Sequence, residues 1–245
     1  MSEEKKETKE KSSHKATITF LIIVVAILAL ALLSVVFKAE INKVWHKIQG
    51  EGTNFTYHDM TFRKTFFGDV MLYETDLAIY RPLENKTIGW TLKFNNDPRI
   101  LDQKIQANLT DKLTRKVYIS FDRAPLQCQD QALAAYKLGE FTEVALGLYV
   151  EPTFASQELA QENNNTYKAK NCSDAQGDWS VILLKGSDSN ESYVHQEGKC
   201  YILETADCKN VETVERFILA LIDTMKAIQP PEEQENESNT TNESI

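Results

Sequence analysis

The run KVYISFDRAPLQCQDQALAAYKLGEFTEVALGLYV, residues 116–150, decides the fold class. Residues 116–121 have the β-branched and aromatic composition of a strand, residues 129–145 have a helical pattern, and residues 148–150 begin another β run before Pro152. Four apolar side chains of the helical stretch can share one face: Leu133, Tyr136, Phe141 and Val144. A strand, a helix and a strand in this order predict a βαβ unit with a parallel strand pair and a right-handed crossover. The fold class is therefore α/β, with α+β as the alternative.

Further strands are predicted on both sides of this unit. Residues 55–80 are aromatic and β-rich, and residues 87–94 alternate so that Ile88, Trp90, Leu92 and Phe94 share a face. Turn chemistry at residues 95–98 ends that strand. Three more β runs, residues 180–184, 193–196 and 201–205, are read as a meander.

The last helix has the clearest apolar period in the chain. Its apolar residues recur at spacings of three and four: Val211, Val214, Phe217, Ile218, Leu221, Ile222, Met225 and Ile228. Asn210 is the predicted N-cap, and Pro230 and Pro231 end the helix. Residues 53–228 therefore form one predicted domain, with a single mixed sheet and two main helices.

An uncharged apolar run, residues 16–37, precedes this domain. At about 1.5 Å per residue it reaches roughly 33 Å, which spans a hydrocarbon core of about 30 Å. The run ends without a small-residue cleavage site, which favours an uncleaved transmembrane anchor over a signal peptide. Residues 38–52 continue as a helical stalk, with Trp45 placed to anchor at the headgroups.

Charge and glycosylation acceptors indicate the orientation of the anchor. More lysines precede the span than follow it, which places residues 1–15 in the cytoplasm. Nine of the fifteen asparagines begin an Asn-X-Ser/Thr acceptor, and all nine follow the span: Asn54, Asn85, Asn108, Asn164, Asn171, Asn190, Asn236, Asn239 and Asn242. The domain is therefore predicted to be extracytoplasmic and glycosylated, in a single-pass protein of the cell membrane. Residues 229–245, acidic and without lysine or arginine, form a predicted disordered tail.

Four cysteines follow the predicted span, where an even number predicts two disulfides. Cys200 and Cys208 bracket a predicted strand, which would hold them too far apart to pair. Cys172 precedes the first strand of the predicted meander, and Cys200 opens the third. These two strands run in the same direction, so both cysteines lie toward one edge of the sheet. Cys128 and Cys208 each follow the end of a strand and lie toward the opposite edge if those strands are parallel. The predicted pairs are Cys172 with Cys200 and Cys128 with Cys208.

The sequence contains no established catalytic or cofactor motif. His58 with Asp59, or His195, supplies general acid–base chemistry only if it meets a carboxylate, and a structural role is favoured for both. Cys128 before a helix is a weak candidate thiolate, disfavoured because the other cysteines offer it a disulfide partner. The histidines lack metal-ligand spacing, and the net charge of −9 disfavours a nucleic-acid partner. We therefore predict no catalytic residue, metal or cofactor.

The string WTLKFNNDPRILD, residues 90–102, resembles a stretch of uncharacterised single-pass membrane proteins of small-genome archaea. The later KCYILE, residues 199–204, and the amphipathic last helix fit the same pattern, over roughly residues 85–228. The resemblance implies a membrane-anchored α/β surface domain with late cysteines and carries over no catalytic residue.

Two functional hypotheses follow. The first is a surface glycoprotein whose domain binds an envelope partner or has a structural role, without catalysis. The alternative is a membrane-tethered envelope hydrolase or transpeptidase that uses Cys128 or a histidine. A histidine beside a carboxylate in a pocket favours the enzyme, whereas paired cysteines and dispersed histidines favour binding.

Overall fold

The computed structural model describes residues 50, 52–81 and 83–228. The chain divides into a first unit that ends at Thr53 and a second unit that begins at Asn54. In the first unit, the amide of Thr53 donates to the carbonyl of Gly50. The predicted cytoplasmic tail, transmembrane run and most of the stalk, with Trp45, lie outside the described residues, as does the acidic end, 229–245. Among the described residues, no helix has both the length and the apolarity needed to cross a bilayer.

The first half of the domain forms a four-stranded antiparallel sheet in the order β1-β2-β3-β4. Its strands are β1 (Asn54–Tyr57), β2 (Met60–Phe67), β3 (Val70–Arg81) and β4 (Lys86–Phe94). The predicted alternation in β4 is confirmed, because Leu92 and Phe94 are buried and Ile88 and Trp90 pack against the same core. One face of this sheet therefore belongs to the core and the other faces outward.

The second half forms a six-stranded mixed sheet in the order β5-β9-β10-β8-β6-β7. Its strands are β5 (Gln106–Asn108), β6 (Lys116–Phe121), β7 (Tyr149–Phe154), β8 (Trp179–Gly186), β9 (Tyr193–Glu197) and β10 (Cys200–Thr205). Strand β6 pairs in parallel with both β7 and β8, and β10 pairs in parallel with β8. The parallel pair predicted for the βαβ unit is therefore confirmed, and the domain has an α/β fold.

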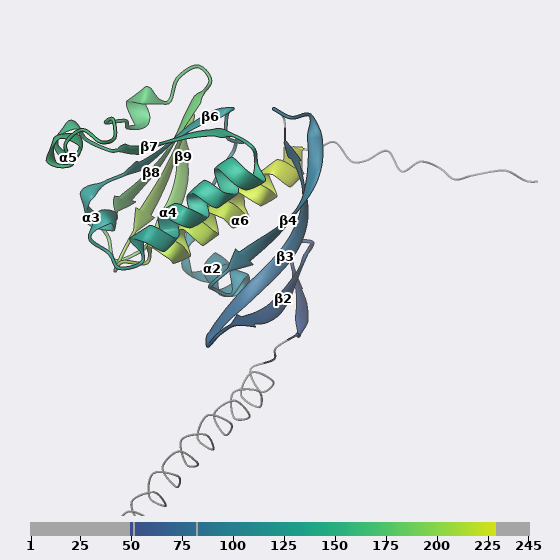
Figure 1. The fold of residues 1–245 in the computed structure, drawn as a ribbon. Coiled ribbons are helices and arrows are strands. Elements are labelled where there is room, and N and C mark those ends of the chain that lie inside the picture. The colour runs from purple at the N-terminus through teal and green to yellow at the C-terminus, as the bar shows by residue number, and fades with distance from the viewer. Residues whose placement is uncertain (1–49, 51, 82, 229–245) are drawn as a thin grey trace, which may run out of the picture. The chain divides into compact units, whose positions relative to one another are not determined.

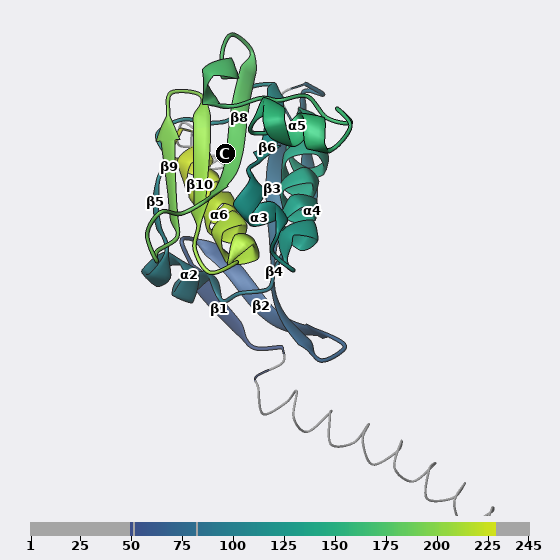
Figure 2. The ribbon, with the colours of Figure 1, turned by 90° about the vertical axis from the view of Figure 1, so that its left-hand side faces the viewer.

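Two helices separate the sheets. The described helices are α2 (Pro98–Lys104), α3 (Arg123–Leu126), α4 (Gln131–Gly139), the π-helix η1 (Glu140–Ala145), α5 (Gln157–Glu162), the 3₁₀-helix η2 (Cys172–Asp174) and α6 (Asn210–Ile228). Figure 1 shows α4 and α6 side by side between the two sheets, and Figure 2 looks onto the outer face of the six-stranded sheet with α6 behind it. Side chains of both sheets and both helices form one continuous core.

The single predicted sheet is wrong, because the strands form two sheets. The reason lies in α6, which is buried on nearly every side over residues 210–222, with Phe217, Leu219 and Leu221 all fully buried. A helix without a solvent face needs cover from two directions. The apolar side chains of β2, β3 and β4 supply the second cover, so these strands lie across the helices from the six-stranded sheet.

The predicted meander is also wrong, because β10 lies between β8 and β9. Strand β10 is the most buried of the three, with five of its six positions buried. The centre of the sheet buries both of its faces, whereas a meander would leave β10 at an edge. Only β9 and β10 form the expected antiparallel pair.

Two details of the helices differ from expectation. Leu133, Tyr136 and Val144 are 41%, 62% and 43% exposed, so the predicted shared apolar face is not the buried one. The buried face of α4 instead includes Ala134 and Leu138, because the small side chain of Ala134 lets α4 approach α6 closely. Asn210 is not the N-cap that its position predicts.

The start of α6 is instead held by two contacts to the α3–α4 region. Asp130 Oδ2 accepts from the amide of Val211 at 2.9 Å, and Asn210 Nδ2 donates to the carbonyl of Pro125 at 3.1 Å. The side chain that caps the amide of Val211, the second residue of α6, therefore comes from a distant position in the sequence.

Helix α2 is an element that the sequence reasoning missed, although its signal was present. Asp97 is its N-cap and accepts from the amide of Arg99 at 3.0 Å, and Pro98 occupies the first turn. Arg99 also binds the Asp97 carboxylate through its guanidinium and lies over the ring of Phe55, with 4.0 Å to the centroid. The predicted turn at residues 95–98 therefore also starts a helix.

Asp97→Ala should lower the free energy of unfolding by about 1 kcal/mol at neutral pH, as for other lost N-caps. The hydrogen bond from the Arg99 side chain lowers the pKa of the Asp97 carboxyl below its usual value in the folded protein. This contribution is therefore fully present above the unfolded pKa of about 3.9 and is lost as the pH falls through the lower folded pKa. Urea unfolding of wild type and variant at neutral and acid pH measures it. A difference that grows on acidification would contradict the assignment.

Candidate functional site

A cavity of about 780 Å³ lies beside the four-stranded sheet, at the C-terminal end of α6. Its apolar walls come from both halves of the domain and contain Met60, Leu77, Ile79, Leu113, Leu146, Leu148, Ile222 and Met225. Its polar and charged lining comprises Asn54, Asp59, Thr61, Arg63, Glu74, Asp76, Lys112 and Lys226, and Ala78 and Tyr80 complete it. Such a volume with mixed walls is typical of a small-molecule or peptide site.

The strand β3 presents its edge to this cavity. Five consecutive residues, 76–80, line it, although successive side chains of a strand point to opposite faces. Strand β2 pairs with β3 only as far as Phe62 opposite Thr75, and beyond that point β4 is the sole partner of β3 within the part of the chain that the structure describes. The cavity therefore contacts backbone as well as side chains.

The charges on the cavity wall are held by one another. Arg63 Nε donates to Glu74 at 3.0 Å, and its Nη1 reaches Asp76 at 3.4 Å. Burial alone would raise the pKa of the Glu74 carboxyl, but Arg63 and Lys93 bring it below its usual value. These side chains therefore form a fixed polar wall of the cavity.

The tight turn between β1 and β2 sits next to the cavity and carries His58. His58 and Asp59 both have positive φ, 46° and 59°, as a two-residue hairpin turn requires. The His58 ring stacks on Tyr57, with 4.1 Å between centroids. Burial, followed by the nearby Asp102 charge, raises the pKa of the Tyr57 hydroxyl.

Helices α2 and α6 hold this turn in place. His58 Nδ1 lies 2.7 Å from Asp223, and its Nε2 lies 3.8 Å from Asp102. Asp102 in turn pairs with the buried Arg216 at 2.6 Å, and Lys226 Nζ donates to the His58 carbonyl at 3.0 Å. The His58 ring is therefore hydrogen-bonded to Asp223 through Nδ1, while its Nε2 lies near Asp102 beyond hydrogen-bond distance.

The other predicted chemical residues do not join this site. His195 lies on β9, in the other sheet, where it stacks on Tyr193 and has Nε2 3.8 Å from Glu197. Cys128 is bonded to Cys208, so it cannot act as a thiolate nucleophile. Within the described part of the chain, no group of His, Cys, Asp or Glu side chains is arranged to hold a metal ion.

The disulfide pairing agrees with the sequence prediction. Cys128 bonds Cys208 and Cys172 bonds Cys200, with Cα–Cα distances of 5.3 and 5.2 Å. The second pair ties η2 to the start of β10. It thereby holds the segment around η2, which covers the outer face of the six-stranded sheet and is called the covering segment. Val181, Cys200 and Ile202 are buried beneath this cover.

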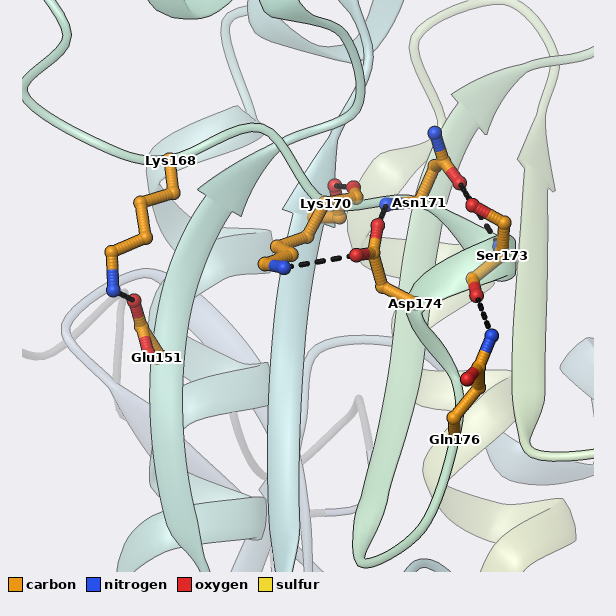
Figure 3. Close-up of polar contacts among 8 residues, drawn as sticks. Glu151, Lys168, Lys170, Asn171, Ser173, Asp174 and Gln176 are labelled. Atoms are coloured by element: carbon orange, nitrogen blue, oxygen red, sulfur yellow. Dashed lines mark hydrogen bonds and ion pairs between the residues drawn. The ribbon is translucent and has the colours of Figure 1, made fainter.

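Figure 3 shows the polar contacts of this covering segment. Lys170 Nζ pairs with Asp174 at 2.9 Å. The carbonyl of Lys170 also accepts from Ser120 Oγ of β6 at 2.6 Å. Asn171 and Asp174 form a capping box around η2. These contacts fix the segment as a cover on the sheet. A structural role explains them, so the segment is not a candidate functional site.

The predicted glycosylation acceptors within the described residues all lie on the surface. Asn54, Asn85, Asn108, Asn164, Asn171 and Asn190 are each exposed. Asn54 lines the cavity, and Asn85 accepts at 2.7 Å from the hydroxyl of Tyr80, which also lines it. Asn236, Asn239 and Asn242 lie outside the described residues. Exposure permits glycosylation at six positions, and the modification itself stays a prediction.

Comparison of the chain with protein-family models, with curated proteins and with solved structures finds no match in any of the three.

Proposed function

We propose that this chain is a membrane-anchored surface glycoprotein whose extracytoplasmic domain binds a ligand in the cavity beside β3, without catalysis. The observation that carries the proposal is the cavity, which is large enough for a ligand and is lined by both apolar and polar side chains. The anchor, the inside N-terminus and glycosylation are inferred from the sequence alone. The two disulfides agree with an oxidising compartment outside the cytoplasm.

The alternative, a membrane-tethered hydrolase or transpeptidase, has one observation in its favour. His58 meets the carboxylate of Asp223, as a general base and its orienting group do. However, His58 is absent from the cavity lining, and its other ring nitrogen faces Asp102. Binding is therefore the better proposal, and the resemblance to archaeal surface proteins stays a prediction beside it.

Photolabelling tests the proposal. The full chain in lipid nanodiscs should react with a small apolar diazirine, trifluoromethyl-phenyldiazirine, at peptides that contain Leu146, Leu148 and Met225. Met225→Trp and Ala78→Trp each place a bulkier side chain in the cavity lining, one from α6 and one from β3, and should each lower this labelling several-fold. Tyr136→Trp, on the exposed face of α4, is the matched control and should not change it. Labelling that is no stronger in the cavity peptides than in the exposed α4 peptide would overturn the proposal.

A further inference from the structure

The cavity contains an open sheet edge. Strand β3 runs to Arg81, but β2 leaves it after Thr75, so among the described residues only β4 is a strand neighbour of residues 76–81. In an antiparallel sheet, alternate residues of a strand direct both their N–H and C=O groups to the same side. Alternate residues of this segment therefore direct unpaired donors and acceptors into the cavity.

The hairpin turn keeps this edge open. The positive φ angles of His58 and Asp59 fold the chain back, so β1 pairs with the far edge of β2 and does not continue along β3. Asp223 and Lys226 of α6 hold the turn in that position. An element that otherwise could cover the edge is thus held away from it.

The far end of the open edge is also fixed. The guanidinium of Arg81 donates to the carbonyl oxygens of Val144 and Ala145, which precede the cavity-lining Leu146 and Leu148. The open edge therefore runs between two anchored ends.

The two sides of the open edge differ in polarity. Leu77 and Ile79 belong to the face of β3 that packs on the core, where Leu113, Leu146, Leu148, Ile222 and Met225 line the cavity. Asp76 and Tyr80 belong to the opposite, outward face. A strand laid along this edge would place every second side chain against the apolar wall and the others against the polar one.

We propose that the occupant of the cavity is an extended peptide segment of another protein, which pairs with residues 76–81 of β3 and has apolar side chains at alternate positions. This inference rests on the proposed binding function and specifies its ligand. An acyl chain would contact the apolar wall but would leave the backbone N–H and C=O groups of the strand edge unpaired. The chain's own end, residues 229–245, does not fit, because Ile245 is its only aliphatic residue.

The probe is a short fluorescent peptide in which valine and leucine alternate with threonine between terminal lysines. Binding is measured by fluorescence anisotropy with the full chain in lipid nanodiscs, against empty nanodiscs. Two further peptides have the same sequence with alternate backbone amides N-methylated, one on each edge of the strand. A strand pairs with β3 through one edge only. One methylated peptide should therefore bind at least about tenfold more weakly, a loss of 1.4 kcal/mol, and the other should retain its affinity.

A scrambled peptide of the same composition should also bind at least tenfold more weakly, because its apolar residues no longer alternate. Hydrogen exchange should slow at amides within residues 76–81 when the parent peptide binds. Met225→Trp should weaken binding and Tyr136→Trp should not. Equal binding of both methylated peptides, or no binding of the parent peptide, would overturn the strand proposal. If the diazirine still labels the cavity in that case, the ligand is a small apolar molecule and the binding function stands. If labelling fails too, both proposals fail.

Discussion

Replacing Lys137 with methionine is expected to lower the free energy of unfolding by about 3 kcal/mol or more, because it leaves a carboxylate buried without its counter-charge. Lys137 Nζ lies 2.9 Å from Glu215 Oε1, and their side chains are 8% and 0% exposed. Glu215 also accepts from the amides of Asn95 and Asn96, at 2.6 and 3.1 Å, and from Asn96 Nδ2. Lys137 donates a second bond to the carbonyl of Lys93. One pair thus joins α4, α6 and the end of β4.

Urea unfolding of the full chain in nanodiscs measures this effect. Lys168→Met is the matched control, since Lys168 pairs with Glu151 at 3.1 Å but is 73% exposed, and its loss should change stability by less than about 1 kcal/mol. The double variant Lys137→Met with Glu215→Gln removes both charges while keeping an acceptor for the Asn95 and Asn96 amides. It should be more stable than Lys137→Met alone. Equal losses of unfolding free energy for Lys137→Met and Lys168→Met would show that the buried pair contributes no more to stability than the exposed one.

The sequence predicts local elements of this domain better than their arrangement. Alternation in β4 and the period of α6 identify those elements, because each pattern reports which side of a single element is apolar. The second sheet was missed because the same patterns do not state which element covers which face. The burial of Lys137 was missed for a related reason, since its partner Glu215 is far away in the sequence.

The disulfides were predicted correctly although the order of their strands was not. The pairing of the cysteines depends only on the direction of each strand, and β6, β8 and β10 do run in parallel. Inserting β10 between β8 and β9 changes neighbours but leaves Cys200 and Cys172 toward the same edge. For the cavity, no local signal existed, because its walls come from segments between Asn54 and Lys226 that are joined only by the fold. The pair of positive φ angles at His58 and Asp59 was equally hidden, since neither residue is glycine or asparagine.

Loss of the Cys128–Cys208 bond is expected to lower the free energy of unfolding by about 4 kcal/mol, and loss of Cys172–Cys200 by about 1 kcal/mol less. The bonds close loops of different length, because their cysteines are 80 and 28 residues apart in sequence. A longer closed loop removes more conformational entropy from the unfolded chain, and this term grows with the logarithm of the loop length. Double replacement of each pair by alanine avoids placing a hydroxyl in the buried position of Cys200, which is 1% exposed.

The two losses should also differ in where the domain opens. Without Cys172–Cys200, the segment around η2 loses its covalent tie to β10, so amides of β8 and β10 beneath it should exchange faster below the global unfolding transition. Without Cys128–Cys208, the faster exchange should centre on the start of α6, where Asp130 and Pro125 receive the bonds from Val211 and Asn210. Unfolding by urea gives the two free energies and hydrogen exchange gives the two locations. A larger loss from the shorter loop would show that contacts of the covering segment outweigh chain entropy, and uniform exchange in both variants would show that neither bond holds a local element in place.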